Sequence, residues 1–438
     1  MRAVMLAVIG ASLLVLAGIG LLLQHEDAHS GFIVLALVQG ALYAGAVGLI
    51  WPGGFSRRAL VAILAAAALM RLGVLLAPPY LSDDVNRYVW DGRVAAAGIN
   101  PYRYVPVDPH LASLRDDAIF PNVNRSTYAP TIYPPVAEAI FLAATRVSES
   151  LTWMKATMVG FEIASVALLL HLLGRLGLPR ERILIYAWHP LALWEFAGSG
   201  HIDAAVIAFV TLALWARQRE AAWLTGSALA AAALIKFFPA VIFPALYRRW
   251  DWKMPAAVAA TALVAYLPFL GAGKSMLGFL PGYLTEEGLQ SGSGFFLWNL
   301  LTGVVPRLRD LGSAPYLALA AAALASLAIY AVMRDKASGA YLASSMALAA
   351  AATVLLSPHY PWYFTWLVPF LCLRPAPSVL YLTVASPLLY FVPGGPDPAG
   401  ARIAVEAAIY GPFALLACLE LRHQLAARAG ASLIEAGT

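Results

Sequence analysis

Long apolar runs follow one another along almost the whole chain, and they restrict its possible folds more than any other feature. The first three, at about residues 3–23, 31–51 and 59–78, each match the roughly 20 residues that a helix needs to cross a bilayer. Hydrophobic residues make up 61% of the chain and charged residues 12%, against roughly 45–50% and about 25% in soluble domains. The sequence therefore predicts an all-α polytopic membrane protein with about 12–14 transmembrane or half-membrane helices.

We expect residues 1–438 to form a single membrane domain. The apolar run in the first 23 residues is longer than that of a signal peptide and is followed by no clear cleavage site, so an uncleaved first helix is expected. The two cysteines, Cys372 and Cys418, both fall in apolar segments, which argues against a disulfide framework. No internal repeat is evident, so a transporter built from two symmetric halves gains no support.

Basic residues gather in alternate loops and predict the orientation of the chain. One set of loops carries Arg57, Arg58, Arg175, Arg180, Arg182, Arg217, Arg219, Arg248, Arg249, Lys253, Arg334, Lys336, Arg374, Arg422 and Arg428. By the positive-inside rule these loops are cytoplasmic. The opposite loops, at 25–30, 79–154, 271–314, 357–362 and 392–402, then face the exterior, which we expect to be the periplasm of a bacterial inner membrane. The net charge of +5 thus records topology, and no nucleic-acid partner is expected.

Two apolar segments do not fit a simple crossing helix. The stretch from Tyr133 to Val147 has only about 15 residues, and a crossing there would invert every later loop. We therefore expect it to be an interfacial helix on the outer leaflet, within the outer segment 79–154. The apolar runs on either side of Lys236 are short as well, and they predict half-helices or a bent hairpin.

Polar side chains concentrate at the predicted outer ends of the helices. The stretch YLSDDVNRYVWDG, residues 80–92, places Asp83 and Asp84 directly after the third apolar run. Other such residues are Glu195, His201, Asp203, Lys236, His359, Tyr360, Trp362 and Tyr363. Ionisable residues near membrane depth are functional candidates, although anchoring at the interface or capping of a helix explains any one of them equally well.

These residue types suit the transfer of a group from a lipid phosphate to a hydroxyl. A carboxylate at a membrane surface can act as a general base, and a cation beside it can neutralise a phosphate. Glycine-rich phosphate loops, zinc-ligand spacings and nucleophile elbows are absent from the sequence. We expect neither a cofactor nor an obligatory metal ion.

The string SDDVNRYVWDGRVAAAGINPY, residues 82–102, resembles the first outer loop of polyprenol-phosphate-mannose-dependent α-(1→6)-mannosyltransferases. These enzymes belong to the C superfamily of membrane glycosyltransferases. Their pattern of Ser-x-Asp-Val, Tyr, Gly and a Gly-hydrophobe-Asp-Pro-Tyr turn falls on Ser82 to Val85, Tyr88, Gly92 and Gly98 to Tyr102. The chain has Asn100 where the family has Asp in the turn, and its two carboxylates, Asp83 and Asp84, are adjacent.

Three further stretches resemble the same family in the same order. These are AWHPLALWEFAGSGHIDAAV (187–206), ALIKFFPAVIFPAL (233–246) and SPHYPWYFTWLVPFL (357–371), the last of which is typical also of glycosyltransferase family 87. The chain departs from the family at His189, which replaces an Asn, and at Ile202, the first of the two residues that are Asn-Asp in the family. The resemblance spans about residues 80–370 and implies a C-type helical bundle.

The resemblance implies an inverting glycosyltransferase that moves a hexose, mannose in this family, from a polyprenyl-phosphate sugar to a lipid-linked or polysaccharide hydroxyl in the lipid bilayer. Asp84 matches the family's Asp before Val and is expected to be the base. Adjacent helical residues point about 100° apart, so one carboxylate can face the acceptor while the other, expected to be Asp83, caps the helix or holds a neighbouring cation. Which of Asp83 and Asp84 is the base stays open. Arg87 lies three residues further on, and we expect it to pair with Asp84 and keep that carboxylate ionised.

The remaining candidates are assigned to substrate binding. Lys236, His359 and Arg87 or Arg103 are expected to hold the leaving phosphate, and the other expected contacts are Tyr88, Asn100, Tyr102, His201, Asp203, Trp362 and Tyr363. Two alternatives remain open from the residues alone. A transporter or flippase would need polar groups along a path through the bilayer, and mid-span charge is sparse, with Glu162 and His171 as exceptions. A glycan ligase would use a similar face but would transfer many sugars at once.

Overall fold

The computed structural model describes residues 1–26, 28–334, 339–391 and 398–436, and within these ranges every regular element is a helix. Seven helical segments are long and apolar enough to cross a membrane: Arg2–His25 (α1), His29–Ile50 (α2), Arg57–Leu75 (α3), Leu151–Arg175 (α6), Lys253–Leu277 (α12 with η6), Ala314–Met333 (α15) and Gly400–Ala426 within α19. Five shorter apolar segments accompany them: Pro135–Thr145, Ala222–Ala233, Ala340–Leu356, Pro361–Leu373 and Pro377–Phe391. The prediction of an all-α polytopic membrane protein is confirmed. Lys336 and most of the predicted loop 392–402 lie outside the described residues.

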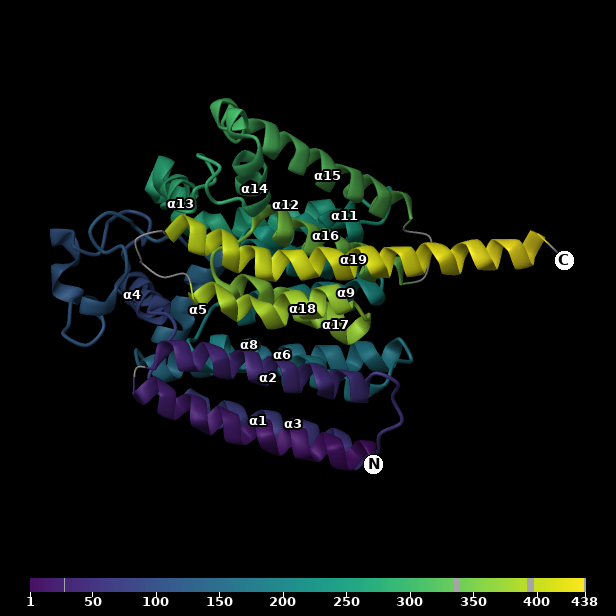
Figure 1. Ribbon diagram of the computed structural model, residues 1–438. Helices are drawn as coiled ribbons and strands as arrows, with labels where there is room; N and C mark the ends of the chain where they lie inside the picture. Colours follow the sequence, from purple (N-terminus) through teal and green to yellow (C-terminus); the bar gives the residue numbers. More distant parts are fainter. Residues whose placement is uncertain (27, 335–338, 392–397, 437–438) are drawn as a thin grey trace.

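The helices run roughly alongside one another, and most of their connections lie at the two ends of the bundle (Figure 1). At one end lie α4 (Asp84–Ala96), α5 (Pro135–Thr145), the 3-10 turns η1 (Pro109–Leu114) and η2 (Phe120–Asn122), and α13 (Leu280–Glu286). We call this the loop end. Both chain termini point toward the opposite end. There, the side chain of Arg2 donates hydrogen bonds to the carbonyls of Leu49 and Gly53 and so ties α1 to the connection after α2.

Several apolar segments are broken rather than continuous helices. After η3 (Arg180–Ile183) the chain forms α7 (Leu184–Ala187), α8 (Pro190–Ala192) and the π-helical turn η4 (Leu193–Gly198) before α9 (Asp203–Gln218). His189 stands at the first break, where its Nδ1 accepts a hydrogen bond from the N–H of Leu191, at 3.2 Å. It thus caps α8 at the place of the family's Asn, a residue type that caps helices in the same way. Single-turn π-helices are frequent at functional sites.

The predicted bent hairpin around Lys236 is present. Helix α10 (Ala222–Ala233) ends just before Lys236, and η5 (Phe238–Ile242) and α11 (Phe243–Leu246) then lead the chain back. Pro239 and Pro244 occupy the second positions of these two short helices, where the missing N–H costs no helical hydrogen bond. The arrangement leaves the Lys236 side chain at the turn, where side chains from several elements surround it.

Helices α4 and α5 pack closely because of one glycine. A Cβ on Gly92 would lie 2.5 Å from the carbonyl oxygen of Phe141 and 2.6 Å from Cγ2 of Thr145. Gly98 ends α4 with a φ of +77°, a conformation that favours glycine after a helix. Helix α5 has 11 residues, about 16 Å at 1.5 Å per residue, which is too short to cross a hydrocarbon core of about 30 Å.

The junction that leads from α3 into α4 is fixed by a buried lysine. Lys155 on α6 is 1% exposed, and its ammonium group donates hydrogen bonds to the carbonyls of Val74, at 3.3 Å, and Ala77, at 2.5 Å. These carbonyls belong to the end of α3, where a positive charge is favoured by the helix dipole. The lysine therefore sets the position from which the chain enters the segment containing Asp84.

Candidate active site

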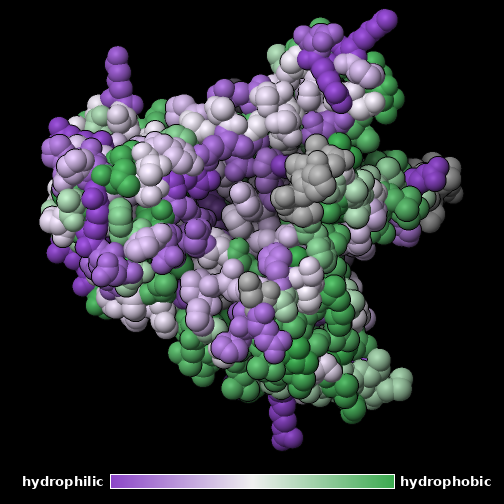
Figure 2. All heavy atoms as spheres, turned by 60° about the vertical axis from the view of Figure 1, so that its left-hand side comes forward, coloured by the Kyte–Doolittle hydropathy of each residue, from purple (hydrophilic) through white to green (hydrophobic). Residues whose placement is uncertain are grey.

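The candidate site lies at the loop end, where four stretches that are far apart in the sequence come together. They are the start of α4, the connection between η4 and α9, the turn at Lys236, and the segment from Ser357 into η8 (Pro361–Leu367). On this face hydrophilic residues surround a hollow, while hydrophobic residues cover much of the neighbouring surface (Figure 2). These are the four stretches that carry the sequence motifs.

The Asp84 carboxylate lies in this site. Its side chain is 17% exposed. Oδ1 accepts a hydrogen bond from Nδ2 of Asn124 at 2.7 Å, and Oδ2 accepts a longer one from the hydroxyl of Tyr133 at 3.5 Å. Nε2 of His201 lies 3.9 Å from the same Oδ2. A partly exposed carboxylate held by neutral donors keeps oxygen lone pairs available for a substrate proton.

Neither of the two adjacent carboxylates caps the helix. The N–H of Asp84 donates instead to Oγ of Ser82, at 3.2 Å, and Asp83, which stands at the N-cap position, makes no side-chain cap hydrogen bond. The expectation that Asp83 caps the helix is therefore wrong. Asp83 is exposed, and its Oδ1 accepts a hydrogen bond from Nδ2 of Asn124 at 3.3 Å.

His201 and Glu195 stand behind Asp84 and are both fully buried. Nδ1 of His201 lies 2.9 Å from Oε2 of Glu195. The other oxygen of Glu195, Oε1, accepts a hydrogen bond from the hydroxyl of Tyr390 at 2.8 Å. The side chains thus form a row that runs from Tyr390 through Glu195 and His201 to Asp84.

Lys236 and Asp203 form a second charged group of the site. Nζ of Lys236 lies 2.6 Å from Oδ2 of Asp203, and it stands 4.5 Å from the centre of the Tyr363 ring, a cation–π contact. The lysine side chain is 11% exposed and that of Asp203 1%. An ammonium group has three donors, so Lys236 can keep its bond to Asp203 and still bind an anion.

Aromatic rings frame the same site. Trp362 stacks on the His201 ring at 4.2 Å between centroids, and Tyr360 stacks on Trp362 at 4.4 Å. Tyr88 is fully buried below them, and its hydroxyl accepts a hydrogen bond from the N–H of Ile202 at 3.5 Å. The stacked rings fix the plane of His201 and leave Tyr360, which is 38% exposed, as the outermost ring.

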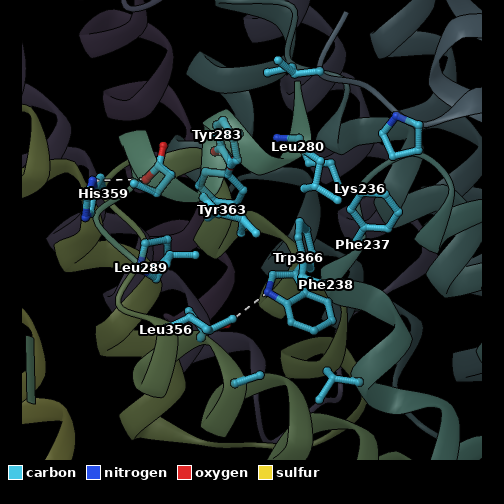
Figure 3. Close-up of a pocket in the computed structure, with 18 of the residues that line it drawn as sticks. Lys236, Phe237, Phe238, Leu280, Tyr283, Leu289, Leu356, His359, Tyr363 and Trp366 are labelled. Carbon is cyan, nitrogen blue, oxygen red and sulfur yellow. Dashed lines mark hydrogen bonds and ion pairs between the residues drawn. The ribbon is translucent and has the colours of Figure 1, made fainter. Parts of the chain in front are cut away.

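An apolar cavity of about 490 Å³ opens beside Lys236. Its lining includes Tyr133, Lys236, Phe238, Tyr283, His359, Tyr363 and Trp366 (Figure 3). Further along, aliphatic side chains of α13, α15 and α16 (Ala340–Leu356) form its walls, among them Leu280, Leu324 and Leu356. Because Tyr133 lines the cavity and its hydroxyl reaches Asp84, the carboxylate lies next to the polar end of this cavity.

His359 reaches the cavity with a carboxylate partner. Its Nδ1 lies 3.1 Å from Oε2 of Glu287, an interaction marked in Figure 3. Burial raises the pKa of Glu287, although the hydroxyl of Tyr283 and the charge of Arg125 act in the opposite direction. Tyr283 also shares a hydrogen bond with Tyr363. The cavity lining therefore includes one ammonium group, one imidazole, one carboxylate and three phenols, those of Tyr133, Tyr283 and Tyr363.

Four of the candidate residues lie away from this centre, and Arg87 is the clearest case. Nε of Arg87 lies 2.9 Å from both oxygens of Asp91, one turn further along α4. Its guanidinium also donates to the carbonyls of Asn124 and Ala129. The expected pair between Arg87 and Asp84 is not formed, because the carbonyls of the loop draw the guanidinium toward Asp91.

The other three lie at the far end of α4. Asn100 shapes the turn: its Oδ1 accepts from the N–H of Tyr102 at 3.0 Å, and its Nδ2 donates to the carbonyl of Phe269 at 3.3 Å. The hydroxyl of Tyr102 donates to the carbonyl of Tyr133 at 2.7 Å. Arg103 is exposed beside the ring of Tyr104. None of these contacts is with the side chain of Asp84, His201 or Lys236.

The sequence did not identify Asn124 and Tyr133 as contributors to the site. It marked Glu195 as a polar residue near the membrane surface but did not predict its contact with His201. Asn124 sits in a polar loop where an Asn is unremarkable, and Tyr133 begins an apolar stretch, so neither gives a sequence signal. Glu195 does give one, because it is a carboxylate within the apolar run LALWEFAG. Within the described ranges, no three His, Cys, Asp or Glu side chains come together as they would to hold a metal ion.

Comparison with known proteins identifies the family. No curated protein and no solved structure matches the chain. The family model described as alpha-(1->6)-mannopyranosyltransferase, N-terminal domain, matches residues 3–251, which is more than half of the 438 residues. This range contains Asp84, Glu195, His201 and Lys236. The chain therefore belongs to the alpha-(1->6)-mannopyranosyltransferase family, and it is a mannosyltransferase embedded in a membrane.

Proposed function

We propose that the protein is an inverting mannosyltransferase that takes mannose from a polyprenyl-phosphate sugar. The acceptor is a hydroxyl of a lipid-linked glycan or a polysaccharide, and transfer takes place on the periplasmic face of a bacterial inner membrane. One observation carries this proposal: Lys236 lines the polar end of an apolar cavity, and the carboxylate of Asp84 lies next to that end, in contact with the Tyr133 hydroxyl. Transfer from this donor requires three things. These are a base for the acceptor hydroxyl, a group that binds the phosphate, and space for the hydrocarbon chain.

The cavity favours a lipid donor over a nucleotide donor. Its walls are mostly aliphatic and aromatic, and burying a prenyl chain there yields about 25 cal/mol for each Å² of apolar surface removed from water. A nucleotide would need polar partners for its base and ribose. A monophosphate, in contrast, needs only a few cationic or neutral donors, which Lys236, His359 and the phenols of Tyr283 and Tyr363 supply.

The transfer step follows from this placement. The acceptor oxygen attacks the anomeric carbon from the side opposite the phosphate, while Asp84 takes the proton of the acceptor hydroxyl. The bond between the anomeric carbon and the phosphate oxygen breaks, and its electron pair leaves with the phosphate. Lys236 neutralises the charge that develops on this leaving group. Attack from the opposite face inverts the configuration of the sugar.

The cavity also bears on the domain organisation. The family model ends at residue 251, whereas Tyr283, His359 and Tyr363 lie beyond that point and face the same cavity as Lys236. Residues 1–438 therefore act as one catalytic domain in this proposal, with the outer segments 79–154 and 271–314 at its periplasmic face. The short loops rich in arginine and lysine at the other end of the bundle support a cytoplasmic location for that end.

Substitution of Lys236 tests the choice of donor. Losing a hydrogen bond to a charged group costs about 1.5–3 kcal/mol, so Lys236→Ala should reduce transfer from a polyprenyl-phosphate mannose roughly 10- to 100-fold. Lys274→Ala is the matched control, because this exposed lysine lies outside the cavity. Since Lys236→Ala leaves Asp203 buried without its cation, the double variant Lys236→Met/Asp203→Asn shows whether the loss follows from misfolding.

Two results would contradict the proposal. One is transfer by the purified wild-type enzyme from a soluble nucleotide sugar with no lipid present. The other is equal use of the polyprenyl donor by Lys236→Ala and Lys274→Ala at matched thermal stability. The first would remove the lipid donor, and the second would remove Lys236 from its binding.

A further inference from the structure

The loop from Asn124 to Tyr133 contacts the proposed base at both of its ends. Nδ2 of Asn124 donates a hydrogen bond to Oδ1 of Asp84 at 2.7 Å, and the hydroxyl of Tyr133 donates a longer one to Oδ2 at 3.5 Å. The position of this loop therefore affects the position of the Asp84 carboxylate.

Helix α13 is attached to the same loop at both of its ends. Just before the helix begins, the N–H of Phe279 donates a hydrogen bond to the carbonyl of Thr131 at 3.1 Å. At its last residue, Oε2 of Glu286 accepts a hydrogen bond from Nε of Arg125 at 2.8 Å. Tyr283 of this helix lines the apolar cavity. One loop thus contacts both the base and part of the wall of the donor cavity.

The two attachments differ in kind. At the start of α13 the backbones lie so close that a Cβ on Gly278 would stand 2.1 Å from the carbonyl oxygen of Thr131, and the φ of this glycine is +58°. Such a contact and such a backbone conformation both favour glycine. At the other end, the attachment depends on the side chains of Arg125 and Glu286, so substitutions there can test it.

Arg125 combines an unusual backbone conformation with several contacts of its side chain. Its φ is +54°, which is uncommon for a residue with a side chain, and such strain persists where the surrounding structure holds it. The carbonyl of Arg125 accepts a hydrogen bond from the N–H of Ala129 at 3.0 Å. The guanidinium group stands 5.9 Å from the centre of the Tyr283 ring, and the side chain is 19% exposed.

We propose that Arg125 is a positioning residue that couples the donor cavity to the base. Its ion pair with Glu286 holds the end of α13 over the cavity, and its backbone continues directly into Asn124, which holds Asp84. This inference rests on the proposed function, in which the cavity takes the lipid donor and Asp84 is the base.

The coupling links two requirements of the reaction. A lipid chain in the cavity contacts α13, and the acceptor hydroxyl has to be within hydrogen-bond reach of the base while that donor is in place. Loss of the ion pair should therefore act on both steps. It should raise KM for the donor, because one wall of the cavity is less firmly held, and it should lower kcat, because Asn124 and Asp84 are less well placed.

The test begins with one variant on each side of the ion pair. Arg125→Asn removes the guanidinium group but keeps a residue type that tolerates the left-handed conformation. Glu286→Gln removes the charge of the partner and keeps Arg125. We expect each to lower kcat about 2- to 5-fold, the range of a partly exposed ion pair, and to raise KM for the donor. The double variant should be no worse than either single variant, because both remove the same interaction.

Glu286→Gln also separates positioning from a direct effect of charge. Burial acts to lower the pKa of Arg125, whereas Glu286 and, to a smaller extent, Tyr133 and Asp84 raise it. Arg125 can therefore act on Asp84 through its charge alone, and this effect survives in Glu286→Gln. The control is Glu220→Gln, which breaks an exposed ion pair with Arg248 away from the site and should change neither kcat nor KM.

A second comparison tests the route through Asn124. Asn124→Ala removes a hydrogen bond to the base and should lower kcat about 10- to 100-fold. In this background Arg125→Asn should lower kcat little further, because the connection is already broken, while its effect on KM for the donor should remain. All variants are compared at matched thermal stability, with a polyprenyl-phosphate mannose as donor and a methyl mannoside as acceptor.

The outcomes separate this inference from the proposed function. If the wild-type enzyme does not use the polyprenyl donor, the proposed function fails, and hydrogen exchange of the α13 amides still shows whether Arg125 holds this helix. Unchanged exchange in Arg125→Asn would overturn the positioning role. If the donor is used, three kinetic results would overturn the coupling while the donor assignment stands. These are normal kcat in Glu286→Gln, a raised KM with unchanged kcat in both single variants, and independent losses of kcat from Asn124→Ala and Arg125→Asn.

Discussion

At the scale of single residues, Asp83 and Asp84 show how neighbouring carboxylates acquire different environments. Asp84 receives hydrogen bonds from Asn124 and Tyr133 and faces His201, whereas Asp83 is exposed and has one longer contact, with Asn124. Asp84→Asn keeps the shape of the side chain but removes the proton acceptor. Because a general base contributes about 10²- to 10⁴-fold, single-turnover transfer should fall by at least that range, while donor binding is retained.

The matched control is Asp83→Asn at equal expression. Asp83 makes no cap hydrogen bond, so its substitution should change turnover only slightly. Near-normal activity in Asp84→Asn would return these carboxylates to an ordinary solvated helix end. An inactive Asp83→Asn beside an active Asp84→Asn would move the base by one residue.

The residue scale also marks the limit of what the sequence could predict. The motif singled out Asp84 because its type and spacing are those of the family. The sequence could not choose between Asp84 and Asp91 as the partner of Arg87, since both lie on its side of α4 at a distance of three or four residues. The choice depends on the carbonyls of Asn124 and Ala129, which reach Arg87 only through the folded loop.

At the scale of elements, Arg87 fastens the loop 103–131 to α4. Its side chain and that of Asp91 are 2% and 3% exposed. Breaking a buried pair by removing one partner costs about 3–5 kcal/mol, so Arg87→Met should destabilise the loop and displace Asn124 from Asp84. Hydrogen exchange of the loop amides measures this loss. The double variant Arg87→Met/Asp91→Leu removes both partners of the pair and should recover part of this loss. Equal protection in the wild type and Arg87→Met would contradict the fastening role.

A second element contact should respond to pH. The hydrogen bond from Arg93, at the end of α4, lowers the pKa of Asp116 to about 2, with help from the N–H groups of Ile119 and Phe120. The folded pKa lies below the unfolded value of about 3.9. The contact therefore stabilises the loop above that value, and the stabilisation is lost as the pH falls from about 4 toward 2. The stabilisation from this ion pair is modest, because the Asp116 side chain is 37% exposed and water screens the charges.

Limited proteolysis of the loop between pH 5 and pH 2 checks this expectation. The wild-type loop should become easier to cleave over that range, and Asp116→Asn should already be easy to cleave at pH 5 and change little below it. An acid-stable protease is needed, with its activity calibrated at each pH on an unfolded peptide. A wild-type loop whose cleavage does not change with pH would show that the pair adds no stability.

At the scale of the whole molecule, composition and run length predicted the class of fold, because hydrocarbon leaves few alternatives to a helix. Breaks within the membrane segments were harder to predict. The hairpin at Lys236 could be anticipated from its short apolar runs, but the π-helical turn at η4 could not. This turn contains Glu195, and the sequence shows it only as an apolar run with a carboxylate in it. The cavity joins segments from Ile132 to Trp366 and could not be read from any local pattern.

The orientation of the bundle is the prediction on which the location of the reaction depends. Arg249 lies at the start of the segment Lys253–Leu277, and the hydrogen bond from Asn100 to the carbonyl of Phe269 ties the far part of that segment to the loop end. Arg249 and the loop should therefore lie on opposite sides of the membrane, and the positive-inside rule predicts that Arg249 is on the cytoplasmic side. Single cysteines at the exposed positions Arg249 and Ala112, in a protein with Cys372 and Cys418 replaced by Ser, can be labelled in intact cells with a membrane-impermeant maleimide. We expect Ala112→Cys to react in intact cells and Arg249→Cys only after lysis.

Labelling of both cysteines from outside would contradict the fold, because the segment Lys253–Leu277 would then not cross the membrane. Labelling of Arg249→Cys alone would place Asp84 in the cytoplasm, where nucleotide sugars are available, and the lipid donor would lose its topological support.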